Sequence, residues 1–218
     1  MSAKKKIVVV DYRVGNHESV VNALRYFQYP LEVSSDAAKI AQADAIVLPG
    51  VGAFHEAMKN LDTLKLVKPL NDAVLKSKKP ILGICLGMQI MAESSTEGGF
   101  CKGLDWIPGV VEELDCKIYK HVPHVGWNNL CLKKKAPLFE RTDADNDFYF
   151  DHSFHINASP EFQAATCLYE QGEITAAVQR GHIFGVQFHP EKSQNTGLRF
   201  FRSFLNFIDH YNPAAVHA

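Results

Sequence analysis

Short apolar runs recur along the first half of the chain, each bounded by polar or turn-forming residues. A continuous run such as Ile7–Val10 is typical of a strand that is covered on both faces. The pattern predicts four strands in this half: Ile7–Val10, Leu31–Ser34, Ala45–Leu48 and Ile81–Ile84.

Apolar residues at helical spacing separate these strands. A first helix begins near His17 and has a face formed by Val20, Leu24 and Phe27. A second helical face is formed by Leu64, Val67, Leu70 and Val74. Pro69 is expected to kink or split this second helix. Because strands alternate with helices, the sequence predicts an α/β fold with a central, mostly parallel sheet flanked by helices, whose ligands bind at the carboxyl ends of the strands.

The pattern changes near residue 98, beyond which short strands follow one another with turn signals between them. Five strands are predicted here: Val110–Leu114, Phe148–Asp151, Ala164–Tyr169, Ile174–Gln179 and Ile183–Phe188. A closing helix has a face formed by Leu198, Phe201, Leu205 and Ile208. We expect this half to add mainly antiparallel strands, and we expect residues 1–218 to form one domain because no repeat or linker interrupts them.

Composition and charge narrow the classes of partner. With 218 residues, 46% of them hydrophobic, the chain is long enough to bury a sizeable core. A net charge of -1 gives no overall attraction to nucleic acid or to an anionic membrane. No run approaches the roughly 18 apolar residues that span a bilayer, and the start of the chain lacks the apolar core of a signal peptide. We therefore expect a cytoplasmic protein without a nucleic-acid or membrane partner.

The cysteines and histidines do not form a metal-binding pattern. The five cysteines are odd in number and scattered, and no two form a C-x-x-C pair, which argues against a disulfide framework or a zinc site. The histidines show no H-x-x-x-H spacing. We assign no metal and no cofactor.

One cysteine has a different context, because Gly83-x-Cys85-x-Gly87 follows a predicted strand and precedes a helical pattern. This is the spacing of a nucleophile elbow, in which a strained strand-to-helix turn presents one side chain above the sheet. The adjoining helix N-terminus favours the thiolate, which is the nucleophilic form. A buried structural cysteine at a strand end is the alternative for this motif on its own.

A base for this thiol is predicted near the end of the chain. The stretch from Gly181 to Phe188 is expected to be a strand that delivers His189 at its end, where Pro190 stops the ladder. Glu191 follows two residues later and supplies a carboxylate that can orient the imidazole ring. Each residue alone has a solvated surface role as its alternative. With Cys85, they provide the nucleophile, base and orienting group of a catalytic triad.

The loop after the third strand contains Gly50, Val51 and Gly52. Two glycines at a strand end allow peptide N–H groups to point into a cleft, as an oxyanion requires. An ordinary glycine turn is the alternative. Its position one strand before the nucleophile favours an oxyanion loop.

Together these motifs resemble the class I (triad-type) glutamine amidotransferases. The resemblance is carried by Gly83–Gln89, by Pro49–Gly52 and by Gln187–Glu191. A closer resemblance, to the glutaminase subunits of imidazole glycerol phosphate synthases, covers nearly the whole chain and is carried by four segments: Asp11–Tyr12 with Gly15–Asn16, Leu48–Phe54, Pro123–Asn128 and Gln187–Ser193.

The resemblance implies a flavodoxin-like amidotransferase fold with additional antiparallel strands in the C-terminal half. It also implies an enzyme that hydrolyses glutamine to glutamate and passes ammonia to a (β/α)8-barrel cyclase subunit in a heterodimer. The pair would form imidazole glycerol phosphate in histidine biosynthesis. Cys85 would form a thioester with glutamine, His189 would protonate the departing ammonia and then activate water, and Glu191 would orient His189.

The same resemblance assigns further contacts. Gln89 and Glu97 would contact glutamine, and the backbone at Ser153 and Phe154 would hold its α-carboxylate. Helical spacing places Gln89 on the same side of its helix as Cys85, although an exposed helix residue is the alternative.

Two residues are predicted to face the partner. Trp127 is a candidate for the interface, with a core tryptophan as the alternative. Lys192 would pair with an acidic residue of the partner, with a solvated lysine as the alternative.

Four positions depart from the pattern of the family. Arg13 stands where glycine is usual, Asp151 replaces an apolar residue, and Phe154-His155 replaces a pair of tyrosines. These departures leave open a related glutaminase subunit that serves amidination of a cell-surface sugar. Two alternatives from other classes also stay open: a catalytically silent binding subunit of the same fold and a free-standing cysteine peptidase.

Overall fold

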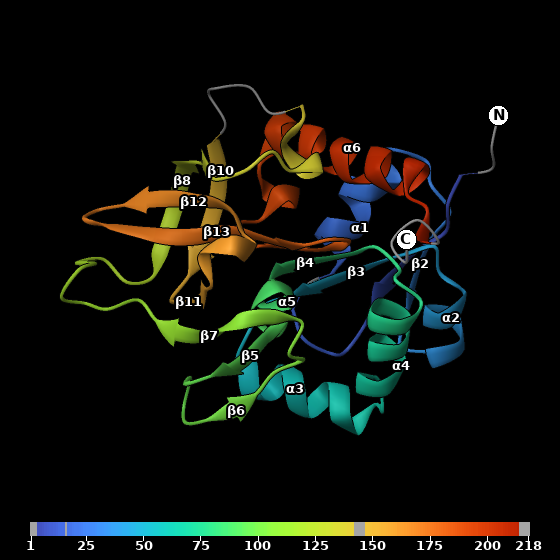
Figure 1. Cartoon of the computed structure of the whole chain (residues 1–218), viewed down its shortest axis with the longest axis horizontal. Helices are drawn as coiled ribbons and strands as arrows, with labels where there is room; N and C mark the ends of the chain where they lie inside the picture. Colours follow the sequence, from blue (N-terminus) through green and yellow to red (C-terminus); the bar gives the residue numbers. More distant parts are fainter. Residues whose placement is uncertain (1–3, 16, 142–146, 214–218) are drawn as a thin grey trace.

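The computed structural model describes residues 4–15, 17–141 and 147–213, so Asn16 of the first loop lies outside the described residues. Its largest sheet has eight strands in the order β2-β1-β3-β4-β14-β13-β12-β9 (Figure 1). Their bounds are β1 Ile7–Val10, β2 Leu31–Ser34, β3 Ala45–Gly50, β4 Ile81–Cys85, β9 Cys131–Leu132, β12 Gln163–Tyr169, β13 Gly172–Arg180 and β14 Ile183–Val186. The five strands from β2 to β14 are parallel to their neighbours, whereas β13, β12 and β9 continue the sheet in antiparallel pairs.

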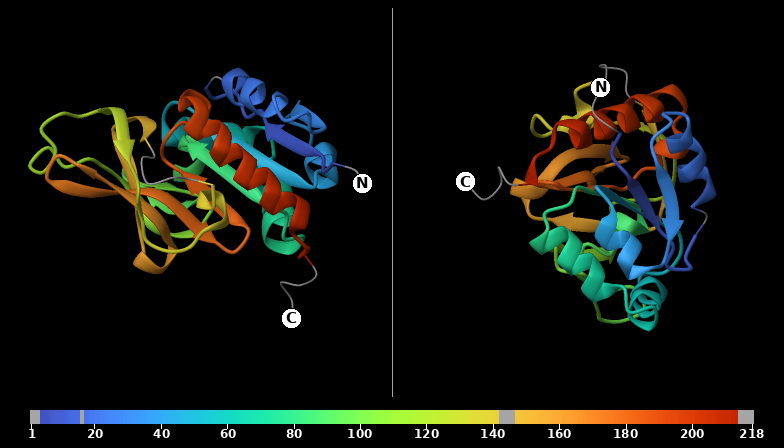
Figure 2. Two further views of the ribbon diagram at one scale, coloured as in Figure 1. Left: turned by 90° about the horizontal axis from the view of Figure 1, so that it is seen from above. Right: turned by 90° about the vertical axis from the view of Figure 1, so that its right-hand side faces the viewer.

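Helices cover both faces of the parallel part (Figure 2). Their bounds are α1 Glu18–Arg25, α2 Ala37–Gln42, α3 Phe54–Thr63, α4 Val67–Asn71 with a π-helical turn Asp72–Lys76, α5 Leu86–Gln89 and α6 Gln194–His210. Short 3-10 turns occur at Pro137–Phe139, Pro160–Phe162 and Pro190–Lys192. Successive residues of β1 point to opposite faces, with Ile7 and Val9 in the cluster that includes α1 and α6, and Val8 and Val10 in the cluster that includes α2, α3 and α4.

Two smaller sheets extend from the carboxyl ends of the parallel strands, at the left of Figure 1. One pairs β8 (His124–Asn129) with β10 (Asp147–His152) in antiparallel register. The other has the order β11-β7-β5-β6, with β5 Ala92–Ser95, β6 Cys101–Lys102, β7 Ile107–Glu113 and β11 Phe154–Ala158. Both lie beside the strand ends at which this class of sheet binds its ligands.

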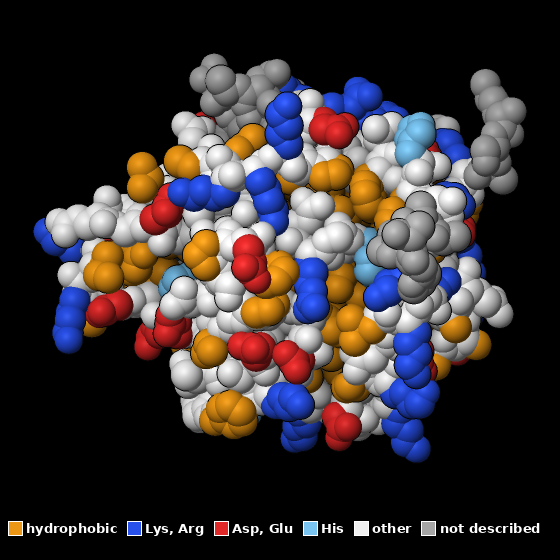
Figure 3. Space-filling view, in the orientation of Figure 1, with side chains coloured by type: hydrophobic (Ala, Val, Ile, Leu, Met, Phe, Trp, Pro, Cys, Tyr) orange, Lys and Arg blue, Asp and Glu red, His pale blue; other side chains and the backbone are white. Residues whose placement is uncertain are grey.

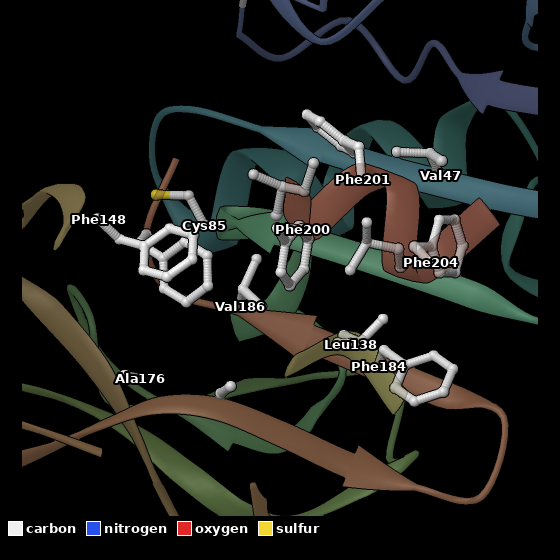
Figure 4. Packing of buried hydrophobic residues seen from close by; sticks show 14 of the residues in the cluster. Val47, Cys85, Leu138, Phe148, Ala176, Phe184, Val186, Phe200, Phe201 and Phe204 are labelled. Carbon is white, nitrogen blue, oxygen red and sulfur yellow. The ribbon is translucent and has the colours of Figure 1, made fainter. Parts of the chain in front are cut away.

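Aromatic side chains fill the core between the sheet and α6. Phe184 packs edge-on against Phe204, and Phe148 packs against Phe188 and Phe200. Figure 4 shows labelled members of this cluster, with Cys85 at one end of it. The core therefore supports the strand end that carries the thiol.

The surface is mixed in charge. Acidic and basic side chains are interspersed over most of the face shown in Figure 3. Among the described residues, no helix has the length and apolar character needed to cross a membrane. Within the same residues, no three His, Cys, Asp or Glu side chains are grouped as metal ligands.

The structure confirms the predicted α/β fold and the first-half strands. The bounds of β1 and β2 agree with the prediction, and β3 is two residues longer because Pro49 and Gly50 stay in register with Ile84 and Cys85. The antiparallel C-terminal strands and the closing helix are also confirmed.

Two predictions were wrong in detail. Pro69 does not split a helix, because it is the third residue of α4, where its missing N–H has no intrahelical partner to lose. The predicted face from Leu64 to Val74 instead spans a break between α3 and α4. The strand predicted to run to Phe188 ends instead at Val186, as β14, so His189 lies three residues beyond the strand. The His189 N–H donates to Tyr149 O of β10 at 2.8 Å, which holds His189 outside the β14 ladder.

Candidate active site

Cys85 is the last residue of β4 and immediately precedes α5. Its backbone angles, φ 53° and ψ -112°, are strained for a residue with a side chain. In the sheet, β4 lies between β3, where Gly50 is the register partner of Cys85, and β14, which leads to His189. The predicted elbow is therefore present, with its thiol at the carboxyl edge of a central strand.

The two glycines of the motif permit this turn. A Cβ atom at Gly87 would lie 1.7 Å from the carbonyl oxygen of Leu48, and one at Gly83 would lie 2.6 Å from the carbonyl oxygen of Gly87. Neither contact is sterically possible without backbone movement. The glycines thus allow α5 to pack directly on β3 and β4, which aims Cys85 at the strand edge.

His189 and Glu191 are brought to this thiol and buried with it. His189 Nδ1 lies 2.7 Å from Glu191 Oε1, and their side chains are only 3% and 5% exposed. Burial lowers the pKa of His189, but hydrogen bonds to Cys85 and Glu191 outweigh it and raise that pKa to about 10. Because Nδ1 bonds the carboxylate, Nε2 is the nitrogen left for the thiol. The solvated surface roles considered for His189 and Glu191 are incompatible with this burial.

The loop that carries His189 is fixed by a serine that sequence reasoning missed. The Ser193 hydroxyl donates to His189 O at 2.7 Å and accepts from Tyr149 N at 3.0 Å. Ser193 is fully buried. Its place at the end of the Gln187–Ser193 segment was the signal in the sequence, and its role depends on β10, which is distant in the chain.

The predicted oxyanion loop lies beside the nucleophile. Gly50 ends β3 opposite Cys85, Val51 is half exposed, and Gly52 has φ +125°, a conformation that favours glycine. A Cβ atom at Gly15 would lie 2.5 Å from Val51 N, so the first loop of the chain packs tightly on this one.

Gln89 and Phe154 are connected to the Cys85 thiol through Gln187, a residue that was not predicted. Gln89 Nε2 donates to Phe154 O at 2.8 Å and lies 3.1 Å from Gln187 Oε1. Gln187 Nε2 in turn donates to Cys85 Sγ at 3.7 Å. Gln89 is only 5% exposed, so the alternative of an exposed helix residue is wrong. Gln187 belongs to the same motif as His189, which is the signal that could have identified it.

Glu97 and Ser153 have other partners in this structure. Glu97 Oε2 accepts a hydrogen bond from Phe54 N at 2.8 Å, at the start of α3 and just beyond the glycine loop. The carbonyl oxygen of Ser153 accepts from Leu114 N at 2.9 Å. The roles of these residues toward glutamine stay predictions.

Trp127 and Lys192 lie on the surface next to His189. Trp127 is 44% exposed and packs edge-on against Tyr149 on the paired strand, so the alternative of a core tryptophan is wrong. Lys192 Nζ lies over the Tyr149 ring and 3.7 Å from Asp151 Oδ2. We refer to these four residues, Trp127, Tyr149, Asp151 and Lys192, as the Trp127 patch.

The departures at Arg13 and Asp151 leave the site intact. Arg13 has φ 63°, the left-handed conformation that glycine adopts readily, so the first loop keeps a glycine-like backbone. Asp151 points to the surface and faces Lys192 of the same chain. Phe154 contributes its carbonyl group, for which the identity of its side chain is not decisive.

Comparisons with known proteins identify the family and the fold. The family model "Glutamine amidotransferase class-I" matches residues 8–207. The chain is 47% identical over 215 residues to imidazole glycerol phosphate synthase subunit HisH 2 of Vibrio vulnificus (strain YJ016), covering 98% of this chain and 100% of the relative. It is 43% identical to subunit HisH 1 of Campylobacter jejuni (strain RM1221), covering 91% and 98%. A crystal structure of a glutamine amidotransferase from Thermotoga maritima, 18% identical, shares the fold with a TM-score of 0.63 over 98% of this chain and 89% of that one.

Proposed function

Because this chain belongs to the class-I glutamine amidotransferase family, we propose that Cys85, His189 and Glu191 form the triad with which it hydrolyses the side-chain amide of glutamine. The observation that carries this proposal is a buried histidine that bonds a carboxylate at 2.7 Å, and whose pKa is raised by that carboxylate and by the Cys85 thiol at a strained elbow. In that setting the thiol proton has a base to accept it and the base has a fixed ring orientation.

The reaction follows from the positions of these groups. The Cys85 thiolate attacks the side-chain carbonyl carbon of glutamine, and the resulting oxyanion is stabilised by N–H groups of the Gly50–Gly52 loop. His189 donates its proton to the departing nitrogen, so that ammonia leaves and a thioester remains. His189 then takes a proton from water, which attacks the thioester and releases glutamate. Glu191 keeps the Nδ1–H of the ring directed away from the reacting atoms.

Substrate binding is assigned to groups around the thiol. Gln89 and Gln187 are buried, with amide groups bonded to one another next to Cys85, and they would shape the end of the glutamine pocket. Glu97 and the backbone at Ser153 and Phe154 would hold the amino-acid end. This second assignment is supported by the family resemblance and by the Gln89 contact to Phe154 O.

We further propose that the chain is the glutaminase subunit of an imidazole glycerol phosphate synthase, as its relatives are named. Its partner would be a (β/α)8-barrel cyclase subunit, docked on the Trp127 patch, in a cytoplasmic heterodimer. Identity above 40% over nearly the whole chain favours this partner over a synthase that amidinates a cell-surface sugar. The assembled triad disfavours a silent binding subunit, and the family disfavours a peptidase.

The test is a glutaminase assay with and without the cyclase subunit of an imidazole glycerol phosphate synthase. Cys85→Ala should lower glutamine-dependent product formation by about 10⁴-fold or more, while added ammonia still supports the partner. Cys167→Ala is the matched control, because Cys167 is also a buried thiol, whose pKa burial raises to about 12. That control should keep its activity.

Three results would contradict parts of the proposal. Normal hydrolysis by the Cys85→Ala variant would exclude the triad. No hydrolysis by the wild type with any cyclase or sugar-amidinating synthase would favour a binding subunit. Hydrolysis stimulated only by a sugar-amidinating synthase would keep the triad and reassign the partner.

A further inference from the structure

Two buried histidines that take no part in the triad face each other in the β8–β10 pair. His124 and His152 are register partners, and they are 0% and 6% exposed. His124 Nδ1 lies 3.0 Å from His152 Nε2. The two remaining nitrogens are also occupied: His124 Nε2 lies 2.6 Å from Asn128 Nδ2, and His152 Nδ1 lies 2.9 Å from Phe154 O.

The partners at the two ends determine where the protons lie. A carbonyl oxygen only accepts, so His152 Nδ1 carries a proton, and in a neutral ring its Nε2 then accepts from His124 Nδ1–H. His124 Nε2 is consequently an acceptor, which the Asn128 amide N–H satisfies. Burial lowers the pKa of both rings, to about 4 for His124 and about 3 for His152, which keeps them neutral. Every donor in this chain therefore points from Asn128 toward Phe154.

The chain of hydrogen bonds continues to the nucleophile. The Phe154 carbonyl oxygen accepts from Gln89 as well as from His152, which uses both of its lone pairs. Gln89 bonds Gln187, and Gln187 bonds Cys85 Sγ. At the other end, Asn128 directly follows Trp127, which is exposed in the patch proposed as the docking face. A continuous series of hydrogen bonds thus runs from Asn128, the sequence neighbour of Trp127, to the thiol.

We propose that His124 and His152 are positioning residues that hold the Phe154 carbonyl, and through it Gln89 and Gln187, in the arrangement that binds glutamine, and that they link this arrangement to the Trp127 patch. This inference rests on the proposed glutaminase function and extends it to residues that do not touch the substrate. Its physical basis is that a polar series with every group satisfied has one low-energy arrangement.

The proton positions can be tested on the free wild-type protein by nitrogen-15 NMR of its histidines. At pH 7, His124 and His152 should both be neutral and protonated at Nδ1, the tautomer that is less common in water. A charged ring, or protonation at Nε2 in either ring, would overturn the inference. This measurement needs neither a partner nor a variant.

The positioning role can be tested with His152→Phe in the complex with the cyclase subunit. This variant keeps a ring but removes both nitrogens, and we expect the KM for glutamine to rise about tenfold, the effect of losing one hydrogen bond, with a smaller change in kcat. Stimulation by the partner should fall as well, whereas the ammonia-driven reaction should be unchanged. His152→Asn, whose amide can still donate to Phe154 O, should recover most of the KM effect.

His182→Phe is the matched control. His182 is also buried, and its Nε2 bonds a backbone carbonyl, that of Val74, at 2.8 Å, but it lies at the opposite end of the parallel strands. Its KM and stimulation should stay within about twofold of the wild type. Equal effects of His152→Phe and His182→Phe would reduce the histidine pair to a structural role.

If His152→Phe does not fold, Asn128→Asp carries the same test. A carboxylate accepts only, so it would force a proton onto His124 Nε2 and disrupt the order of donors. We expect altered histidine tautomers and a higher KM, and an unchanged KM would overturn the inference. An inactive wild-type complex would instead count against the proposed function, which keeps the two failures distinct.

Discussion

His189 and the His124–His152 pair are buried to a similar degree near the same edge of the sheet, yet they differ in charge. All three rings are at most 6% exposed. The pKa of His189 is raised to about 10, whereas those of His124 and His152 are lowered to about 4 and 3. Burial is common to the two regions and therefore cannot explain the difference.

The partners of the rings explain it. His189 faces two groups that carry negative charge when ionised, the Glu191 carboxylate and the Cys85 thiol, and both favour the protonated ring. The histidine pair contacts an amide, a backbone carbonyl and another imidazole, none of which compensates for a buried charge. One region is thus suited to moving a proton, and the other to holding fixed dipoles.

Removing the carboxylate should erase most of the difference. In Glu191→Gln, His189 keeps a hydrogen-bond partner but loses its negative neighbour, so its pKa should fall toward the values of the buried pair. Glutamine hydrolysis should fall about 10²- to 10⁴-fold, because the ring is no longer held in its tautomer or stabilised when charged. Steady-state kinetics in the complex would measure the loss of activity, and nitrogen-15 NMR of His189 would measure the change in its pKa.

Glu173→Gln provides a control for this substitution. Glu173 is an exposed carboxylate that bonds Lys133 and Thr166 away from the thiol, and its loss should leave hydrolysis within about twofold of the wild type. Activity of Glu191→Gln at the level of this control would remove the carboxylate from the mechanism.

The two regions should also produce opposite pH dependences of stability. His124 and His152 have pKa values below the unfolded value of 6.5, so their contribution is complete above that pH and is lost as the pH falls toward 3. His189 has a raised pKa, so its contribution is complete below pH 6.5 and is lost as the pH rises toward 10. Each group can contribute a slope of up to about 1.4 kcal/mol per pH unit in its window.

Urea denaturation of the wild type, His152→Phe and Glu191→Gln between pH 4 and 9 would separate these slopes. The difference between wild type and His152→Phe should shrink as the pH falls below 6.5. The difference between wild type and Glu191→Gln should shrink as the pH rises above 6.5. Parallel curves for all three proteins would show that neither region titrates as described.

The sequence predicted the charged region better than the neutral one. Cys85 lies in a local motif, and its strand and turn follow from consecutive residues. His189 and Glu191 were predicted as its partners because their chemical roles complement a thiol. The first-half strands were predicted for the same local reason, since buried parallel strands are continuous apolar runs.

The neutral region depends on contacts that no local pattern contains. β8 and β11 were not predicted as strands, and the pairing of His124 with His152 requires the register of β8 and β10 across 28 residues. Gln187 was quoted within a motif, but its bond to Cys85 requires β14 to lie next to β4. α2 and α3 were not predicted from the sequence pattern either.

Tyr12 offers a third case, in which burial has no compensating partner at all. Its hydroxyl is fully buried below Gly50, where a Cβ atom would lie 2.2 Å from it, and among the described residues it has no hydrogen-bond partner. Burial, and to a smaller extent Cys85, raises the pKa of Tyr12 well above its usual range.

If partners decide the energetics of a buried polar group, Tyr12→Phe should raise the free energy of unfolding by about 1 kcal/mol, because an unpaired hydroxyl costs that much to bury. Urea denaturation at pH 7 would measure the change, with Tyr29→Phe, which removes a hydroxyl bonded to Asp209, as the paired control. A Tyr12→Phe protein less stable than the wild type would mean that this hydroxyl is satisfied in solution.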